Sequence, residues 1–216
     1  MTRRLWLSLA IPLALAGCRD VTAPPGEQNA VAPPLGMIYQ LPSTRAPVHI
    51  LQEAATAPLL ETYQVSFWVR HDRETMVAVN YQPAPGQSVG QPFLRFHIPK
   101  FGLMYGPDGA RVAGSDSLLI TMTIDPVYLS VDFQPSGVVF SSVFHPQLVM
   151  WYTNANPDLN GDGVVNVWDQ WLEWQLAIWG QTTRTQAWFK TPSNNDTSKK
   201  YVVGNIYHFT EYGICW

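Results

Sequence analysis

The sequence predicts an all-β fold, a β-sandwich with a short helical turn after an inserted calcium-binding loop. From residue 48 onward, short alternating runs are rich in β-branched and aromatic side chains. Turns rich in Gly, Pro, Asn and Asp separate these runs, and almost no long stretch has helical periodicity. Strands are expected at 62–70, 74–81, 92–99, 118–124, 127–133, 137–140, 147–153, 186–190, 200–209 and 212–216.

The first two of these runs flank a charged turn, His71-Asp72-Arg73. Two strand-like runs joined by a short polar turn are typical of a β-hairpin. We therefore expect residues 62–70 and 74–81 to pair with each other.

The N-terminal residues predict export and lipid attachment. Two arginines precede an apolar stretch, residues 5–16, which is too short to span a bilayer. The stretch runs into the residues LAGC (15–18), which resemble the lipobox of bacterial lipoproteins. The resemblance implies a signal peptide over 1–17, cleavage before Cys18, and several acyl chains on Cys18, which anchor a protein stably. The alternative is an ordinary secretory signal with a chance cysteine.

Residues 18–47 contain six prolines and little periodicity, which predicts a tether ahead of one domain over 48–216. If Cys18 carries lipid, Cys215 has no partner in the chain, so a core must stabilise the domain. We expect a bacterial cell-envelope protein that contacts the membrane through Cys18. In some bacteria, an Asp directly after the lipid-carrying cysteine retains a lipoprotein in the inner membrane. This sequence has Arg19 at that position, so the outer membrane or cell surface is favoured.

Charge bears on the class of partner. The net charge is −3, and it becomes −5 without residues 1–17, because they contain two arginines and no acid. A mildly acidic chain without a Lys/Arg cluster argues against a nucleic-acid partner. The expected partner is therefore an unknown protein or a glycan.

The most informative stretch is NPDLNGDGVVNVWDQWLEW, residues 156–174. An EF-hand loop has oxygen ligands at positions 1, 3, 5, 7, 9 and 12 and a glycine at position 6. Residues 158–169 fit this spacing, with Gly163 at position 6, so calcium is the expected cofactor. The expected ligands are Asp158, Asn160, Asp162, the carbonyl of Val164, Asn166 and Asp169. The alternative is a metal-free turn capped by Asp and Asn side chains.

This loop is similar to the dockerin form of the motif, DxNxDGxVNxxD, in which position 12 is Asp. Dockerins carry two copies and this sequence carries one, so cohesin binding is not implied. The segment before the loop has the pattern of a strand and a loop, not of an entering helix. The residues expected to line one face of a short helix that passes into a strand are Trp168, Trp171, Leu172, Ile178 and Trp179.

Residues 92–216 resemble the ZU-five domain of zona occludens proteins, ankyrins and netrin receptors. The shared features are a PxG-apolar-F turn after a strand, a strand after a proline, and a late HFT-x-Y strand. The matching residues are Phe133, Pro135, Gly137, Phe140, Pro146, His208, Phe209 and Tyr212. The resemblance implies a β-sandwich used mainly for protein–protein contact, but a fold alone assigns no function.

The segment HFTEYGI (208–214) also resembles the self-cleaving site of some ZU-five domains and of the related GPCR autoproteolysis-inducing domain. The resemblance implies that His208 is the base, that Thr210 is the nucleophile, and that the bond between Phe209 and Thr210 is cut. The alternative is a last β-strand without chemistry. No GxSxG, P-loop or dinucleotide motif is present.

Several tryptophans lie near the candidate loop. Aromatic platforms beside a calcium-braced loop are how many carbohydrate-binding modules hold sugar rings. Trp168, Trp171 and Trp174 are therefore a candidate ligand platform, unless they pack the helix onto the sheet. The function expected from the sequence is a non-catalytic, calcium-binding surface module for protein binding or a structural role. The alternatives are a carbohydrate-binding module and an autoproteolytic domain.

Overall fold

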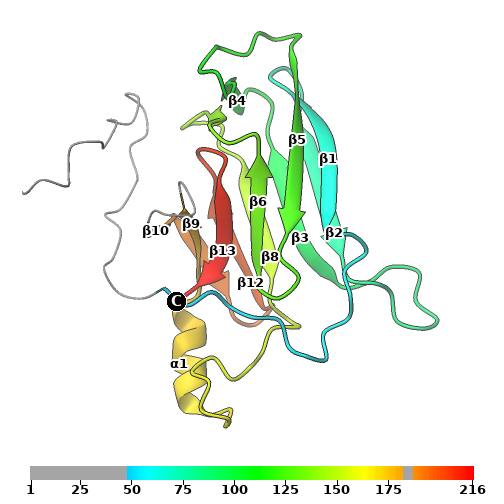
Figure 1. The fold of residues 1–216 in the computed structure, drawn as a ribbon, viewed down its shortest axis with the longest axis vertical. Helices are drawn as coiled ribbons and strands as arrows, with labels where there is room; N and C mark the ends of the chain where they lie inside the picture. Colours follow the sequence, from blue (N-terminus) through cyan, green and yellow to red (C-terminus); the bar gives the residue numbers. More distant parts are fainter. Residues whose placement is uncertain (1–47, 182–186) are drawn as a thin grey trace, which may run out of the picture. The chain divides into compact units, whose positions relative to one another are not determined.

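Two antiparallel β-sheets face each other in the computed structural model, which describes residues 48–181 and 187–216 (Figure 1). The first sheet has, in order, β1 (Gln64–Arg70), β5 (Ser117–Ile124), β6 (Ser130–Gln134), β13 (Glu211–Cys215), β9 (Ala177–Gln181) and β10 (Trp188–Lys190). The second has β11 (Ser193–Asp196), β12 (Tyr201–Asn205), β8 (Gln147–Trp151), β3 (Pro92–Ile98) and β2 (Thr75–Asn80). The predicted all-β sandwich is confirmed. The predicted signal peptide, Cys18 and the tether lie outside the described residues.

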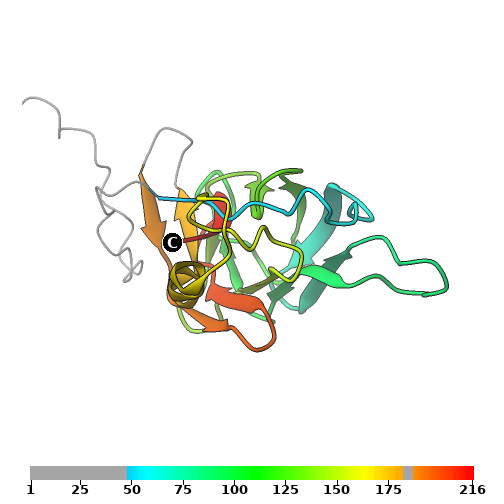
Figure 2. The ribbon, with the colours of Figure 1, turned by 90° about the horizontal axis from the view of Figure 1, so that it is seen from below.

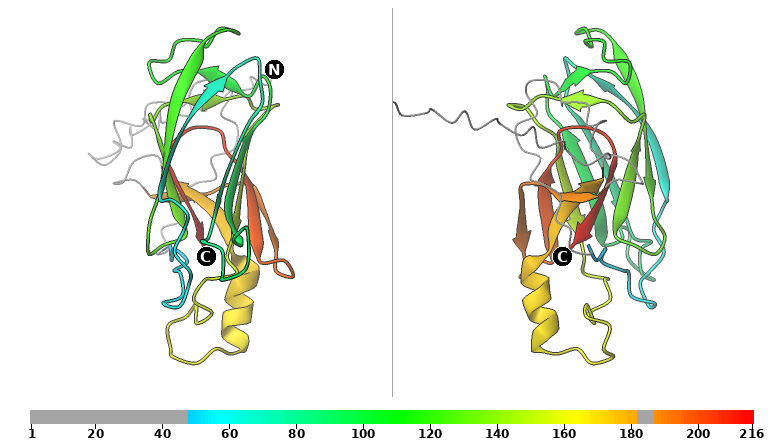
Figure 3. Two further views of the ribbon diagram at one scale, coloured as in Figure 1. Left: turned by 90° about the vertical axis from the view of Figure 1, so that its right-hand side faces the viewer. Right: turned by 60° about the vertical axis from the view of Figure 1, so that its left-hand side comes forward.

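Two short elements complete the fold. β4 (Leu103–Tyr105) pairs with β7 (Val139–Phe140), and α1 (Val167–Gln175) lies between β8 and β9. Figures 2 and 3 show that α1 and the loop before it extend from one end of the two sheets. Among the described residues, no helix is long and apolar enough to cross a membrane.

The core between the sheets is built from alternating residues of each strand. In β5, Ile120, Met122 and Ile124 are buried, while the residues between them are more exposed. Aromatic rings then link the two sheets. The ring of Phe96 in β3 lies 4.7 Å from that of Phe133 in β6, which stacks on Phe209 at 4.9 Å.

Most residues behind the ZU-five resemblance contribute to this core. Phe133, Phe140, Phe209 and Tyr212 are all buried, and Phe140 and Phe209 meet edge to face at 4.8 Å. These positions therefore shape the sandwich and do not form an exposed binding surface.

The predicted hairpin of residues 62–70 and 74–81 is wrong. β1 pairs with β5, whereas β2 pairs with β3 in the other sheet. The charged turn carries the chain from one layer to the other: Arg70 binds Asp72 at 2.7 Å, and His71 Nδ1 lies 2.6 Å from the carbonyl oxygen of Leu103. The prediction failed because β1 and β2 each bury alternate residues against the same core. Two paired strands of a hairpin have this same sequence pattern, so the pattern does not distinguish the two arrangements.

Other boundaries also differ from the prediction. The strand expected at 127–133 begins at Ser130, because Asp125 Oδ1 accepts hydrogen bonds from the backbone N–H groups of Val127 and Tyr128 and turns the chain. Ile178 and Trp179 lie in β9 and not on the helix. β4 and β11 were not expected from the sequence, whereas β9 lies where the helix was expected to pass into a strand.

We predict that Phe209→Ala lowers the free energy of unfolding by about 3–5 kcal/mol, because it opens a cavity among stacked rings. Phe144→Ala is the matched control, since Phe144 is 48% exposed and should cost less than about 1 kcal/mol. Urea unfolding monitored by circular dichroism measures both. Equal, small losses in the two variants would contradict the placement of Phe209 in the core.

Candidate functional site

The candidate calcium loop leaves the sandwich after β8, and its start is hydrogen-bonded to residues 52–54. Asn156 N–H donates to the carbonyl of Gln52 at 2.8 Å, and Ala54 N–H donates to that of Asn154 at 2.9 Å. Leu159 is half-buried against the main core. The loop therefore has a fixed base, while residues 160–165 are exposed.

Asp158 organises the first half of the loop. Its Oδ1 accepts the backbone N–H groups of Gly161 (2.9 Å) and Asp162 (3.2 Å), and its Oδ2 accepts that of Gly163 (2.8 Å). Gly161 and Gly163 have φ values of 72° and 86°, a region that other residues rarely adopt. The structure thus gives the glycine at position 6 the sharp turn that an EF-hand loop requires.

The next candidate ligands bind one another. Asn160 Nδ2 donates to Asp162 Oδ2 (2.9 Å), and Asn166 Nδ2 donates to the carbonyl oxygen of Val164 (2.9 Å). Asp162 Oδ1 accepts the backbone N–H of Val164 (2.8 Å). Two candidate ligand oxygens, Asp162 Oδ2 and Val164 O, therefore hold amide donors that a bound cation would replace.

Asp169 closes the loop and starts the helix. It is 2% exposed; Oδ1 accepts the N–H groups of Leu159 (2.8 Å) and Asn160 (3.2 Å), and Oδ2 accepts that of Asn166 (2.7 Å). Asn166 Oδ1 accepts the N–H of Trp168 (2.8 Å), so Asn166 and Asp169 form a capping box. These backbone donors, that of Asn166 foremost, hold the pKa of Asp169 below its usual range, so it is charged at neutral pH.

The donor set has the chemistry that calcium requires. Within the described residues, no three His, Cys, Asp or Glu side chains converge as a metal-binding group. The candidate set, however, also draws on amide and carbonyl oxygens, which calcium accepts alongside carboxylates. No ion pair in the described part of the chain joins Asp158, Asp162 or Asp169 to a basic side chain. The loop thus carries three carboxylates without a basic partner.

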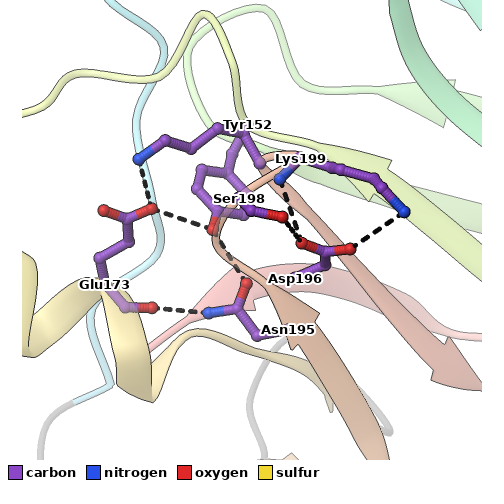
Figure 4. A network of polar contacts seen from close by, with 7 residues as sticks. Tyr152, Glu173, Asn195, Asp196, Ser198 and Lys199 are labelled. Carbon is purple, nitrogen blue, oxygen red and sulfur yellow. Dashed lines mark hydrogen bonds and ion pairs between the residues drawn. The ribbon is translucent and has the colours of Figure 1, made fainter.

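Polar contacts hold the other end of α1 to the sandwich (Figure 4). Lys200 Nζ binds Glu173 Oε1 at 2.5 Å, and Asn195 Nδ2 donates to the carbonyl of Glu173 at 2.6 Å. The hydroxyl of Tyr152 lies 3.1 Å from Glu173 Oε1 and 2.9 Å from Asn195 Oδ1, and its single proton serves one of them at a time. Burial, together with the charge of Glu173, raises the pKa of Tyr152, so the hydroxyl stays protonated.

A cavity of about 270 Å³ lies between the loop, α1 and the end of the sandwich. Leu51, Leu159 and Leu176 line it together with Asp169 and Glu173. It separates the loop from the sheets and is smaller than the usual pocket for a small organic ligand.

The tryptophans near the loop fall into two groups. Trp179 is 7% exposed, and Trp151 is half-buried. Trp168, Trp171 and Trp174 are 65%, 53% and 69% exposed, so they do not pack α1 onto a sheet. The proposed platform residues are therefore available to a partner.

The candidate cleavage site lies inside the sandwich. His208, Phe209 and Thr210 are all buried, and burial lowers the pKa of His208 to about 4, so the imidazole is neutral at pH 7. The carbonyl of His208 accepts the Tyr212 hydroxyl at 2.8 Å. Among the described residues, only Phe101 and Lys200 are non-glycine residues with positive φ, so no left-handed strain falls on the candidate scissile bond.

Sequence reasoning missed the residues that orient the helix. Tyr152, Glu173 and the pair Asn195 and Lys200 come from three separate places in the chain: the end of β8, the helix α1 and the hairpin of β11 and β12. The helix start, by contrast, carried a signal, because Asn166 and Asp169 have the spacing of a capping box.

We predict that the loop and the first turn of α1 loosen in acid. Since the folded pKa of Asp169 is depressed, its stabilisation is complete above the unfolded pKa near 4 and is lost as pH falls through the folded value. Hydrogen-exchange protection at Leu159, Asn160 and Asn166 should therefore fall between pH 6 and pH 3. Asp169→Asn should show low protection at both pH values, while Asp108→Asn, in a turn elsewhere, should behave like the wild type. Unchanged protection in Asp169→Asn would contradict this role.

No protein-family model, no curated protein and no solved structure matches this chain. The lipobox-like, ZU-five-like and dockerin-like patterns remain resemblances of sequence, and the function proposed below depends on the residues and their geometry.

Proposed function

We propose that the protein is a non-catalytic, calcium-binding surface module of a bacterial cell envelope, anchored through lipid on Cys18. The observation that carries the calcium part is the loop 158–169. Its candidate ligands are all oxygens, its glycines make the required turns, and its carboxylates pair with no basic side chain of residues 48–181 and 187–216. The anchoring part rests on the sequence of residues 1–18.

Calcium fits this donor set better than other common metals do. Zinc and copper favour imidazole and thiolate ligands, and residues 158–169 contain neither His nor Cys. Magnesium demands a rigid octahedron, whereas calcium accepts six to eight oxygens in flexible arrangements. An exposed loop built on two glycines suits the more adaptable ion.

A bound calcium ion would stabilise the structure of the loop and would have no catalytic role. A cation at Asp158, Asp162 and the carbonyl of Val164 takes over from the amide donors of Asn160 and Asn166. Asn160 Oδ1 and Asn166 Oδ1 accept the backbone N–H groups of Asp162 and Trp168, and each oxygen keeps a second lone pair for the ion. The ion also relieves repulsion among the carboxylates, so it would brace the loop and the start of α1.

We predict that calcium raises the unfolding temperature of the purified protein. A ligand that binds only the folded state stabilises it by about 2.7 kcal/mol at a hundredfold excess over Kd. Asp162→Ala should abolish the rise. Asp108→Ala is the matched control, because each of these aspartates accepts a backbone N–H two residues ahead, at 2.8 Å for Asp162 and 3.0 Å for Asp108. Asp108→Ala should keep the calcium response.

The experiment compares melting curves in EGTA and in millimolar calcium. A wild-type protein that folds but shows no shift at any calcium concentration would leave residues 158–169 as a metal-free polar turn. Magnesium at equal concentration should give a smaller shift.

We predict that the protein isolated from bacterial membranes starts at Cys18 and carries acyl chains there. Denaturing intact-mass spectrometry should show the mass of residues 18–216 plus the lipid, and Cys18→Ser should remove the lipid and release the protein from the membrane fraction. Unacylated wild-type protein would refute the anchor. The same spectrum tests the autoproteolysis alternative, since a cut after Phe209 would remove residues 210–216 from the main chain.

A further inference from the structure

The helix α1 has reversed polarity relative to an ordinary surface helix. A surface helix normally turns an apolar stripe toward the core and polar residues toward water. In α1, Asp169 is the only buried residue, and Glu173 binds the sandwich through Tyr152, Asn195 and Lys200. Four apolar side chains, those of Val167, Trp168, Trp171 and Trp174, are exposed, and that of Leu172 is half-buried.

The outward residues form one continuous surface, which we call the tryptophan face. Val167, Trp171 and Trp174 follow the i, i+4, i+7 spacing of one helical face, and Trp168 neighbours Trp171 one turn away. The loop before the helix also exposes Val164 and Val165, at 61% and 59%, and Val165 lies at the edge of the cavity beside α1. Exposed apolar groups that are contiguous mark an interaction site.

We propose that the tryptophan face binds a lipid surface, so that the loop–helix excursion is a second point of membrane contact beside the lipid on Cys18. The proposal builds on the envelope location given above, but it does not require the loop to hold calcium. Tryptophan is the side chain that favours the boundary between lipid and water, because its large ring is apolar and its indole N–H is polar.

The position of the chain's entry supports this partner. The described chain begins at Val48, and His49 N–H donates to the carbonyl of Trp216 at 3.3 Å. Val48 and His49 line the same cavity of about 410 Å³ as Asp158 and Asn160. The described chain therefore begins beside the candidate loop, at the end from which α1 extends (Figure 1). An anchor at Cys18 raises the local concentration of this end at the membrane, so weak contacts suffice.

Charge identifies the kind of lipid surface. Residues 112–181 contain no Lys or Arg, and the excursion carries the acids Asp158, Asp162, Asp169 and Glu173. The excursion itself therefore offers no basic side chain to anionic lipid, and its apolar side chains must supply the affinity. The expected surface is zwitterionic, and calcium at the loop should extend binding to anionic lipid by lowering the negative charge.

The position of the tryptophan face also favours lipid over other kinds of partner. The face lies on a helix that extends from the end of the sandwich. A protruding apolar surface can enter a soft lipid boundary, whereas most small ligands are held in concave, largely pre-formed sites. The cavity beside α1 is lined by Asp169, Glu173 and Leu176 and not by the tryptophans.

Flotation with phosphatidylcholine vesicles tests the proposal. The protein begins at residue 18 and carries Cys18→Ser, so neither the apolar N-terminal stretch nor an acyl chain contributes to binding. The triple variant Trp168→Gln, Trp171→Gln, Trp174→Gln should lose at least about tenfold in vesicle partition. The matched control is Trp68→Gln, because Trp68 is 62% exposed on β1 and belongs to no such face. It should bind like the parent protein.

A second measurement does not depend on the variant. Vesicles with brominated acyl chains should quench part of the parent protein's tryptophan fluorescence, and plain vesicles should not. Equal partition of all three proteins, or no quenching, would overturn the proposal. The proposal would also be overturned if the parent and control proteins were dimers and the triple variant a monomer, or if the protein bound glycans but not vesicles. If the lipid proposal fails in one of these ways but calcium still raises the unfolding temperature, the proposed calcium-binding function is retained.

Discussion

The helix α1 is held to the sandwich by polar contacts, because no apolar side chain of α1 is buried. One carboxylate, that of Asp169, is central to this arrangement. It accepts N–H groups from the start of the loop and from the helix cap together, so it fixes the distance between them. The shape of the candidate ion site and the direction of the tryptophans both depend on it. Since charged hydrogen bonds are stronger than neutral ones, a single acidic group can do this.

The amide groups of Asn160 and Asn166 give the loop a defined form with or without an ion. They donate hydrogen bonds to the oxygens that a cation would otherwise satisfy. Ion binding then exchanges one set of partners for another and does not order a disordered chain. Little conformational entropy is lost in such an exchange, which favours affinity.

The sequence was most informative where structure is set locally. The spacing of Asp, Asn and Gly in residues 158–169 predicted the turns of the loop, because Asx side chains and glycines act on backbone two to five residues away. Alternating apolar residues located the long strands, such as β3 and β5, since alternation reflects one buried face.

Contacts between distant residues were not predictable in this way. β1 and β2 have the pattern of a hairpin, and only packing of the whole chain places them in separate sheets. β11 has the polar sequence SNND and is a strand because it pairs with β12. The contacts among Tyr152, Glu173, Asn195 and Lys200 likewise unite three separate segments: the end of β8, α1 and the hairpin of β11 and β12. These contacts orient α1 and so determine that Trp168, Trp171 and Trp174 are exposed. The sequence alone therefore could not show which tryptophans lie in the core and which on the surface.

The place of β13 in the sheet has a consequence for biosynthesis. It follows every other strand in the chain, yet it lies between β6 and β9 in the middle of the first sheet. While the chain is still emerging, β6 and β9 lack their shared neighbour, so that sheet stays in two parts. If the chain is exported as proposed above, completion of this sheet by the final strand would delay folding before export.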